Sequence, residues 1–348
     1  MEENGWNSLP PCDAEASSAG GFSAEEQLPE RPTAATGNAP LLLAGPTAVG
    51  KSAIALLLAE RLNGEIISVD SMQVYRGLDI GTAKPTPDER RRVPHHLIDI
   101  LDLTESFDAA QFVQHARAAI ADIQARGRTP ILCGGTGLYF KAFLEGLGPT
   151  PPADMALRAE LEVTPMPDLL RELQQRDPVT FEKIDRQNLR RLIRALEVIR
   201  LTGQPYSAQR AAWSPVSPSP SLASRFFCFS RSADDLRARI DARVDDMFQR
   251  GLVDETRNLL SRGLAGNQIA LQALGYRQVV EHLRGERLLP ETIAVVKSRT
   301  HKFAKRQMTW FRRQVPVQWI ELLPGQSPEA GAAQLVSALL LPLAGGGR

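Results

Sequence analysis

Between residues 40 and 145 the chain alternates short apolar runs with longer segments whose apolar residues recur every three or four positions. The apolar runs have the length of buried strands and occupy residues 41–44, 65–69, 95–100 and 130–133. The helical pattern covers residues 52–62, 108–127 and 136–144. Strands that alternate with helices indicate a parallel sheet covered on both faces, so we predict an α/β fold.

Beyond the proline-rich segment at residues 149–152 the pattern becomes mainly helical, apart from one apolar run at residues 226–230. That run predicts a strand that returns to the sheet, and residues 234–314 are again helical. The predicted parts are a disordered tail (1–38), a core (39–150 and 225–325), a helical insertion (151–215) and a Ser/Pro linker (213–224).

Charge is distributed unevenly along the 348 residues. Residues 1–40 contain seven acids and one base, whereas the remainder contains 40 bases and 33 acids. Of the 41 bases in the chain 34 are Arg, whose planar group suits phosphates and the faces of nucleobases. An Arg-rich, basic body is compatible with a nucleic-acid or phosphate partner.

Three features favour the cytoplasm. No apolar run approaches the roughly 18 residues that a membrane helix needs. The acidic start of the chain is unlike a secretory signal. The three cysteines, Cys12, Cys133 and Cys228, are odd in number and far apart, which argues against a disulfide framework or a zinc site. We therefore expect a cytoplasmic protein that contacts no membrane. We also expect a monomer, although the sequence does not determine the oligomeric state.

The strongest local signal follows the first predicted strand. The sequence there matches GxxxxGK[ST], the phosphate-binding loop, at the required place between a strand and a helix. Backbone amides and the helix N-terminus supply partial positive charge, Lys51 adds a full charge, and the Ser52 hydroxyl is placed to bind Mg²⁺. An ordinary glycine turn that caps a helix is the alternative. The loop consists of Gly45, Pro46, Thr47, Ala48, Val49, Gly50, Lys51 and Ser52.

This loop refines the predicted fold class to a P-loop NTPase-like parallel core with a helical insertion and a basic, helical C-terminal part. Asp70 follows the second predicted strand, at the edge of the sheet where ligands bind. Its carboxylate suits a water-mediated Mg²⁺ contact or a general base, and a turn aspartate is the structural alternative. Asp79 and Asp99 are weaker candidates of the same kind. The glycine-rich turn at residues 134–137 fits a second anion site, although a tight strand-to-helix connection is the favoured explanation.

Two basic stretches suit an RNA partner. Residues 188–200 place their apolar side chains on one helical face and their arginines elsewhere. Residues 297–313 contain seven Lys or Arg and no acid, with Phe303, Trp310 and Phe311 interleaved. Basic groups with aromatics suit a nucleic-acid backbone and unstacked bases. The alternative in both cases is a solvated amphipathic helix, whose aromatics in the second stretch belong to the core.

Taken together, these segments resemble one family in order and spacing. They are GPTAVGKS, ISVDSMQVYRGLDIGTAKP, HHLIDI, GGTGLYFKA, NLRRLIRALEV, LGYRQ and KRQMTWFR. They are similar to tRNA dimethylallyltransferases (tRNA isopentenyltransferases) over about residues 40–320. The resemblance implies a prenyltransferase that uses Mg²⁺ and moves the dimethylallyl group from dimethylallyl diphosphate to tRNA. The acceptor would be the exocyclic N6 amine of the adenosine just 3′ of the anticodon, and diphosphate would be released.

The resemblance also implies roles for residues at matching positions. Residues 45–52 would bind the diphosphate, with Ser52 at the metal, Asp70 as the general base and Arg243 at the donor diphosphate. The family's loop is usually GPTASGKT, so Val49 and Ser52 depart from it, although Ser52 keeps the hydroxyl. The residues that would contact tRNA are Asp70, Ser71, Met72, Gln73, Thr136, Arg158, Arg190, Arg191, Leu192, Ile193, Arg194, Gln272, Ala273, Leu274, Gly275, Tyr276, Arg277, Lys305, Arg306, Gln307, Trp310 and Arg312.

Three other functions share some of these features. A small-molecule or nucleotide kinase would use the loop, with ATP and Mg²⁺, for phosphoryl transfer, but it leaves the basic, aromatic C-terminal stretch unexplained. An RNA-binding regulator with a nucleotide switch would need a second acidic strand end for Mg²⁺. An enzyme that prenylates a free adenylate differs only in its acceptor, and the basic stretches favour RNA.

Overall fold

The centre of the protein is a parallel sheet. The computed structural model describes residues 38–147, 151–211, 222, 224–267 and 269–340. Six strands form the sheet in the order β3-β2-β4-β1-β5-β6, and every neighbouring pair is parallel. The strands are β1 (Leu41–Ala44), β2 (Gly64–Val69), β3 (His95–His96), β4 (Thr129–Gly134), β5 (Phe226–Ser230) and β6 (Gln318–Glu321). The predicted α/β fold with a parallel sheet is confirmed.

The inner strands read as continuous apolar runs because both of their faces are buried. In β1, Leu41 and Leu43 join one hydrophobic cluster, whereas Leu42 and Ala44 join another on the opposite face. All four side chains are fully buried. Alternate residues of a strand point to opposite sides of the sheet, so a strand in the middle of three layers has no solvent face.

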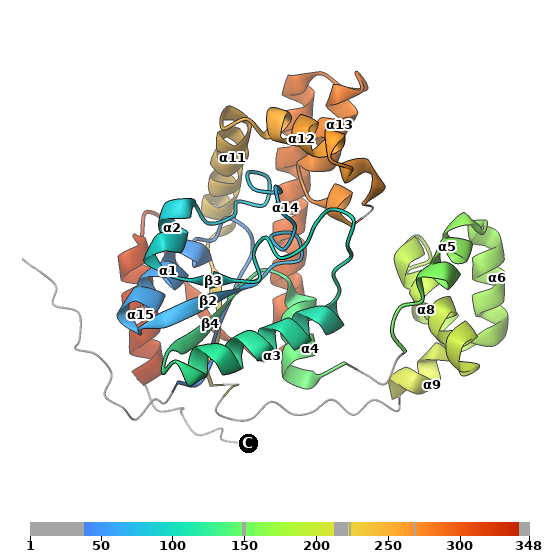
Figure 1. Ribbon diagram of the computed structural model, residues 1–348, viewed down its shortest axis with the longest axis horizontal. Helices are drawn as coiled ribbons and strands as arrows, with labels where there is room; N and C mark the ends of the chain where they lie inside the picture. Colours follow the sequence, from blue (N-terminus) through green and yellow to red (C-terminus); the bar gives the residue numbers. More distant parts are fainter. Residues whose placement is uncertain (1–37, 148–150, 212–221, 223, 268, 341–348) are drawn as a thin grey trace, which may run out of the picture. The chain divides into compact units, whose positions relative to one another are not determined.

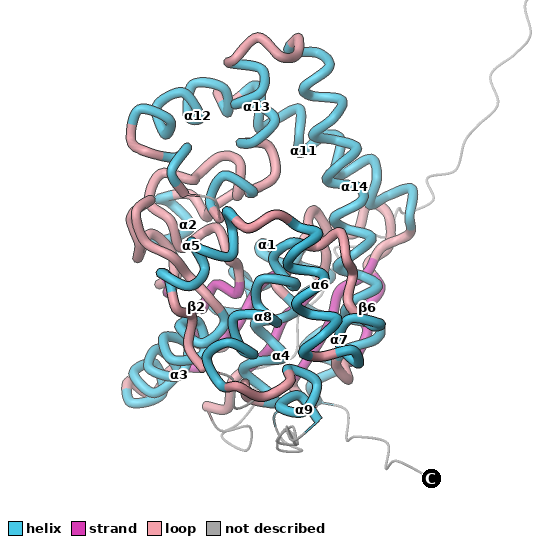
Figure 2. The backbone as a smooth tube through the Cα atoms, turned by 90° about the vertical axis from the view of Figure 1, so that its right-hand side faces the viewer, coloured by secondary structure: helices cyan, strands magenta, loops and turns pink. Residues whose placement is uncertain are grey.

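Helices cover both faces of the sheet, as Figure 1 and the tube in Figure 2 show. On one face lie α1 (Lys51–Arg61) and α15 (Pro328–Leu340), whose Ile54 and Leu335 share a cluster with Leu43. On the other face lie α3 (Ala109–Ala125) and α4 (Gly137–Glu145), which contribute Phe112 and Phe140 to the cluster around Leu42. The predicted cap of α3 is present, because Asp108 accepts hydrogen bonds from the first-turn amides.

Residues 151–211 form a group of helices with a hydrophobic core of their own. Leu161, Leu169, Leu173 and Leu196 are fully buried within it. The helices are α5 (Met155–Val163), α6 (Met166–Arg176), α7 (Pro178–Lys183), α8 (Leu189–Thr202) and α9 (Tyr206–Ala211).

The C-terminal part is dominated by long helices. The 26-residue α14 (Leu289–Gln314) packs along α11 (Ala233–Gln249). Between them, Lys297 forms an ion pair with Asp245, and His301 Nε2 lies 2.7 Å from Asp241 Oδ1. The C-terminal end of α14 contributes the fully buried Phe311 to the hydrophobic cluster around Leu42, which we call the main core. The structure also describes the helices α2 (Pro87–Arg92), α12 (Leu252–Ser261) and α13 (Tyr276–Leu283), with 3-10 turns at Leu264–Gly266 and Ala270–Gln272.

Two predicted boundaries are wrong. The strand predicted at residues 95–100 stops at His96, because Leu97 and Asp99 have positive φ angles of 61° and 56° and leave the extended conformation. The predicted core ended at residue 325, yet α15 lies beyond it and packs on α1. The predicted tail, apart from residue 38, and the predicted linker, apart from residues 222 and 224, lie outside the described residues.

The described cysteines, Cys133 and Cys228, are free and buried. Burial raises the pKa of Cys133 to about 11 and that of Cys228 to about 12, so both thiols stay protonated at neutral pH. In the part of the chain that the structure describes, no helix is long and apolar enough to cross a membrane.

Candidate active site

The predicted phosphate-binding loop connects β1 to α1, at the edge of the sheet where the strands end. Three of its residues have positive φ angles: Gly45 (153°), Ala48 (63°) and Gly50 (106°). A Cβ on Gly45 would lie 3.0 Å from the Val49 side chain and 3.1 Å from Phe229 O, so this position needs glycine for space as well as for conformation. Lys51 Nζ donates to Pro46 O at 3.3 Å, across the loop.

Asp70 lies at the end of β2 and forms a turn. Its Oδ1 accepts hydrogen bonds from the Met72 N–H at 2.8 Å and the Gln73 N–H at 3.2 Å. Asp70 is therefore a turn aspartate, as the structural alternative predicted, but only one of its two carboxylate oxygens forms the turn. Oδ2 is outside these two bonds, and the side chain is only half-buried. The carboxylate can thus hold the turn and still act on a ligand.

Lys51, Asp70 and Arg243 lie close enough to interact electrostatically. Burial lowers the pKa of Lys51, and Arg243 lowers it further, while Cys133 and Asp70 oppose the shift. Burial likewise lowers the pKa of Arg243, and Asp70 opposes this. The structure thus brings the loop, the strand-end carboxylate and the arginine of α11 to one edge of the sheet. Two cations around one carboxylate form a site suited to an anionic ligand.

The glycine-rich turn after β4 serves close packing. A Cβ on Gly134 would overlap Val69 O, one on Gly135 would overlap Gln307, and one on Gly137 would overlap the ring of Trp310. These glycines let β4 approach β2 and let α14 approach the start of α4. The favoured explanation, a tight strand-to-helix connection, accounts for the turn. Thr136, a predicted tRNA contact, is the half-buried residue that precedes α4.

Gln307 is buried beneath the phosphate-binding loop and does not face solvent. Its Oε1 accepts a hydrogen bond from the Thr47 N–H at 2.9 Å, and its Nε2 donates to Gly135 O at 2.9 Å. Both ends of its amide thus hold backbone groups in this conformation, and its predicted contact with tRNA stays a prediction. Gln307 couples α14 to the loop after β1 and to the turn after β4.

The segment after Asp70 is held by buried polar contacts. The Gln73 amide accepts from Ser68 Oγ at 2.8 Å and donates to Thr82 O at 3.1 Å, so this predicted tRNA contact is used within the protein. Its neighbour Ser71 is half-buried, and Met72 packs against the main core. The segment therefore carries the predicted RNA-facing residues on a fixed backbone.

Lys84 fixes the far end of this segment. Its ammonium group is buried and donates to Tyr75 O at 2.6 Å, and it also pairs with Asp79 and Asp99. Asp99 has its pKa lowered because hydrogen bonds from Lys84 and Arg90 outweigh the opposing effect of burial. Asp79 and Asp99, predicted as weaker acid candidates, are thus counter-ions of Lys84 that hold the segment in place.

Glu255 of α12 joins this segment to α13. It accepts hydrogen bonds from the Ile80 N–H at 2.9 Å and from Tyr276 OH at 2.6 Å, and the Gly81 N–H donates to Tyr276 OH at 3.1 Å. Burial and the Glu255 carboxylate raise the pKa of Tyr276, so its hydroxyl remains a donor. Of the predicted tRNA contacts at residues 272–277, Gln272 and Arg277 are exposed and Leu274 is half-buried, whereas Ala273, Gly275 and Tyr276 are buried. Their contact with tRNA stays a prediction.

Replacing Glu255 by Ala should lower the free energy of unfolding by roughly 2–4 kcal/mol, because it leaves two partly buried donors without an acceptor. The exposed neighbour Asp254, replaced by Ala, is the matched control and should change stability by less than about 0.5 kcal/mol. Urea unfolding curves of the two variants check this. Equal stabilities for both variants would show that Glu255 does not hold the segment.

In the helical group of residues 151–211, one buried carboxylate organises several predicted tRNA contacts. Glu197 is fully buried and pairs with Arg158 and Arg194, at 2.8 Å and 2.6 Å. Leu192 and Ile193, two of the predicted contacts, have side chains buried in the core of this group, and their contact with tRNA stays a prediction. Arg190 and Arg191 are exposed and remain candidates for a contact with RNA.

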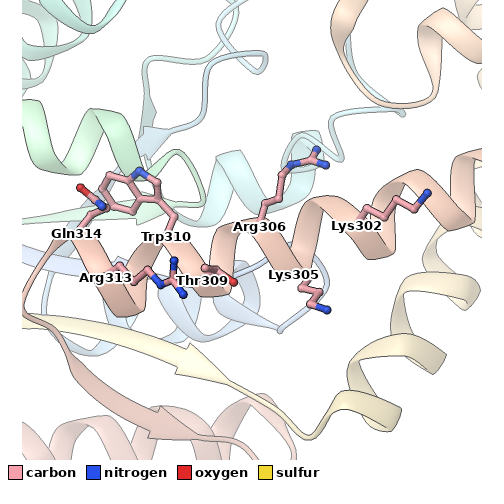
Figure 3. A pocket seen from close by; sticks show the side chains of 7 residues that line it. All are labelled: Lys302, Lys305, Arg306, Thr309, Trp310, Arg313 and Gln314. Atoms are coloured by element: carbon pink, nitrogen blue, oxygen red, sulfur yellow. The ribbon is translucent and has the colours of Figure 1, made fainter. Parts of the chain in front are cut away.

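The second basic stretch forms one face of α14. A pocket of about 510 Å³ lies on this face, and its lining side chains all come from the helix, as Figure 3 shows. The sequence left open whether the aromatic residues of this stretch belong to the core. Phe311 does belong to the core, whereas Trp310 is half-buried and lines the pocket. The lining residues are Lys302, Lys305, Arg306, Thr309, Trp310, Arg313 and Gln314. We call them the α14 groove.

The α14 groove includes Lys305, Arg306 and Trp310, which the sequence singled out, and adds Lys302 and Arg313, which lay in the basic stretch but were not selected. Their spacing was the available signal, because residues three, four and seven apart share a face of a helix. Arg312 lies outside the groove, with its guanidinium 5.8 Å from the ring centre of the exposed Trp319.

The parallel sheet and the glycine-rich loop after its first strand define this chain as an α/β protein of the P-loop class. The family model described as IPP transferase matches residues 73–314, which is more than half of the chain. The chain belongs to the IPP transferase family.

Relatives and solved structures agree with this assignment. A tRNA dimethylallyltransferase 1 of Trichlorobacter lovleyi is 48% identical over 285 residues, covering 80% of this chain and 92% of the relative. A tRNA dimethylallyltransferase of Geobacter metallireducens is 46% identical over 290 residues, covering 82% and 93%. The structure of a tRNA isopentenylpyrophosphate transferase from Bacillus halodurans is similar, with a TM-score of 0.62, 40% identity and coverage of 87% and 97%. A eukaryotic dimethylallyltransferase acting on tRNA gives a TM-score of 0.72 at 27% identity, with coverage of 86% and 77%.

Proposed function

We propose that this protein transfers the dimethylallyl group of dimethylallyl diphosphate to tRNA and releases diphosphate. The acceptor is the exocyclic N6 amine of the adenosine just 3′ of the anticodon. The observation that carries the proposal is the meeting of Lys51, Asp70 and Arg243 at one edge of the sheet, in a chain that also carries the basic α14 groove. The names of the relatives support the same activity.

The phosphate-binding loop serves the leaving group. As the allylic carbon–oxygen bond breaks, negative charge develops on the diphosphate, and donors aimed at that charge lower the barrier. The amides of the loop, the start of α1, Lys51 and Arg243 supply such donors. Because the allylic carbon tolerates positive charge, holding it between the departing diphosphate and the amine supplies a further part of the rate.

Asp70 serves the acceptor. The amine of adenine is a weak nucleophile, so a carboxylate that takes its proton during attack favours formation of the carbon–nitrogen bond. The turn formed through Oδ1 fixes the carboxylate, and Oδ2 is outside that turn. The proton moves from the amine to Asp70, while the electron pair of the broken bond leaves with the diphosphate.

The residues at this edge also fit Mg²⁺ bound together with a diphosphate. The Ser52 hydroxyl is exposed in the first turn of α1, and Asp70 offers oxygen at the neighbouring strand end, which are the ligands that Mg²⁺ prefers. The described residues include no group of three or more His, Cys, Asp or Glu that could hold a metal by themselves. Ser52 would hold the ion directly and Asp70 through water, and the ion would neutralise charge on the leaving diphosphate.

RNA binding falls to exposed basic side chains. The α14 groove combines cations with the half-buried ring of Trp310, which suits a phosphate backbone and an unstacked base. The target base must leave its stack, at a cost of a few kcal/mol, and contacts to the surrounding RNA offset that cost. Arg190 and Arg191 of the helical group offer further exposed charge.

The direct test is nucleoside mass spectrometry of tRNA after incubation with the purified protein and dimethylallyl diphosphate. We expect one adenosine per substrate tRNA to gain a dimethylallyl group. Parallel incubations with ATP and with free adenylate address the kinase and the adenylate-prenylating alternatives. Phosphorylated products, or a prenylated adenylate with unmodified tRNA, would overturn the proposal.

Replacing Lys51 by Ala should weaken the binding of inorganic pyrophosphate by about 10- to 100-fold, because a charge-assisted hydrogen bond at the loop is lost. Arg61 at the other end of α1, replaced by Ala, removes the same charge and should leave the affinity unchanged. Isothermal titration calorimetry in Mg²⁺ measures both. If the two variants bind pyrophosphate equally well, the loop is not the diphosphate site.

A further inference from the structure

Two arginines hold the outer side of the phosphate-binding loop, and neither has a role in the function proposed above. Arg239 Nε donates to Ala48 O at 2.9 Å, and Arg231 Nε donates to Val49 O at 2.8 Å. Arg231 directly follows β5, and Arg239 lies in the second turn of α11. The two guanidinium groups therefore bind consecutive carbonyls of the loop.

The far ends of both guanidinium groups converge on Gly50. A Cβ built on Gly50 would lie 3.6 Å from Arg231 Nη2 and 3.8 Å from Arg239 Nη2. Gly50 is the N-cap of α1, with a φ of 106°. Two cations thus flank the positive end of the helix, immediately beside Lys51.

The bonds to the loop carbonyls also orient the loop amides. In a trans peptide group the carbonyl and the following N–H point in opposite directions. The bond from Arg231 to Val49 O therefore turns the Gly50 N–H away from Arg231. Ala48 has a φ of 63°, which is unfavourable for a residue with a Cβ, so external hydrogen bonds help to keep this conformation.

Arg231 is itself fixed by segments distant in the sequence. Its side chain is only 4% exposed, and its Nη1 donates to Asp235 Oδ2 at 2.8 Å and to Leu323 O at 3.0 Å. Arg231 thus links the loop to α11 and to the chain that leaves β6. The segment after β6, which lies outside the residues matched by the family model, thus supports the loop through its contact with this side chain.

The pair carries a charge repulsion that an anion would relieve. Burial lowers the pKa of Arg239, the neighbouring Arg231 lowers it further, and Asp235 opposes the shift. Lys51 adds a third cation at the same loop. Like charges held together in a partly buried site favour the binding of a negatively charged ligand.

We propose that Arg231 and Arg239 are positioning residues for the donor diphosphate. They hold the Ala48 and Val49 carbonyls so that the loop keeps its binding conformation, and they add positive charge beside Gly50. This inference rests on the proposed function, because it assumes that the loop receives a diphosphate.

The test uses Arg231→Gln and Arg239→Gln in the full chain. Glutamine keeps an N–H donor for the loop carbonyl but removes the charge, and Arg237→Gln on the exposed side of α11 is the matched control. We expect each variant to bind Mg²⁺–pyrophosphate on the order of tenfold more weakly and to raise the KM for the donor similarly. The kcat at saturating donor and the Kd for tRNA should stay within about twofold of the unchanged protein, and Arg237→Gln should leave all four quantities unchanged.

Thermal unfolding separates positioning from simple structural support. Without ligand, Arg239→Gln should melt at the same temperature as the unchanged protein or higher, because a repulsion has been removed. Arg231→Gln should melt at a lower temperature, because it also loses the buried ion pair with Asp235. The rise in Tm on adding pyrophosphate should be smaller. If the two Gln variants had a lowered Tm without ligand but an unchanged affinity for pyrophosphate, the two arginines would only stabilise the fold. That result would overturn the inference.

A comparison with Lys51→Ala distinguishes a failure of the arginine pair from a failure of the diphosphate site itself. If the unchanged protein binds pyrophosphate, Lys51→Ala does not, and both Gln variants bind it normally, only the role of Arg231 and Arg239 is refuted. If neither the unchanged protein nor any variant binds pyrophosphate or the donor, the diphosphate site itself is refuted, and the inference with it.

Discussion

Replacing Asp70 by Asn should lower the turnover of dimethylallyl transfer about a thousandfold and leave the affinity for tRNA within about twofold of its original value. The amide has the shape of the carboxylate, and its oxygen can still accept the bonds from the Met72 and Gln73 N–H groups, so the turn after β2 persists. It lacks a basic oxygen, however, and cannot take the proton of the attacking amine. Single-turnover kinetics with saturating donor and tRNA measure the rate, and filter binding measures the affinity.

A second effect of the same variant separates a proton acceptor from a residue that orders the loop. Asp70 lies near two cations, Lys51 and Arg243, and its negative charge repels an anion bound beside them. Removing that charge should therefore strengthen the binding of pyrophosphate. Asp88→Asn, on the exposed helix α2, removes one carboxylate elsewhere and should change neither quantity. Unchanged turnover of Asp70→Asn would remove Asp70 from the mechanism. Turnover and pyrophosphate affinity that fall together would make it a support of the loop.

The parallel core could be predicted because its information is local. The run at residues 41–44 is buried on both faces, and its boundaries in the structure agree with the prediction. The glycines and the lysine of the next segment occupy fixed positions along the chain, so their spacing alone defined the loop. Asp70 was predicted for the same reason, since it directly follows an apolar strand.

The supports of the site could not be predicted because they depend on contacts between distant parts of the chain. Gln307 lies 260 positions from the Thr47 amide that it binds, and Arg231 lies 182 positions from Val49. In the sequence Gln307 is one polar residue of a basic helix, and its burial becomes evident only when α14 lies against the loop. The hydrogen bond of Tyr276 could not be predicted for the same reason, because its partner Glu255 is on another helix.

Helical periodicity alone could not predict which aromatic residue of the basic stretch faces the core. Trp310 and Phe311 are adjacent, so they point about 100° apart around α14, and either could have faced the core. The structure buries Phe311 against Phe140 and leaves Trp310 at the groove beside Gly137. The sequence specified that aromatics and cations share a helix, whereas the packing of α4 decides which aromatic is accessible.

The α14 groove yields the second large prediction. Replacing Lys302, Arg306 and Arg313 together by Gln should weaken tRNA binding on the order of a thousandfold at low salt, if each contributes about 1.5 kcal/mol through a phosphate contact. The dependence of log Kd on log salt concentration should also become shallower by about 2, because about 0.7 counterions are released per contact with single-stranded RNA. Filter binding of a tRNA anticodon arm across a salt series measures both quantities.

A matched triple variant decides whether position or total charge matters. Arg91, Arg257 and Arg284 are exposed arginines outside the groove, and replacing them by Gln removes the same three charges. We expect this control to weaken binding only a few-fold at about 0.1 M salt, because charges separated from the RNA by more than about 10 Å are then largely screened. Equal losses in the two triple variants would mean that net charge alone attracts the RNA. The whole chain has a formal charge of only +1, so a specific footprint must come from cations concentrated on one face, and α14 provides that concentration.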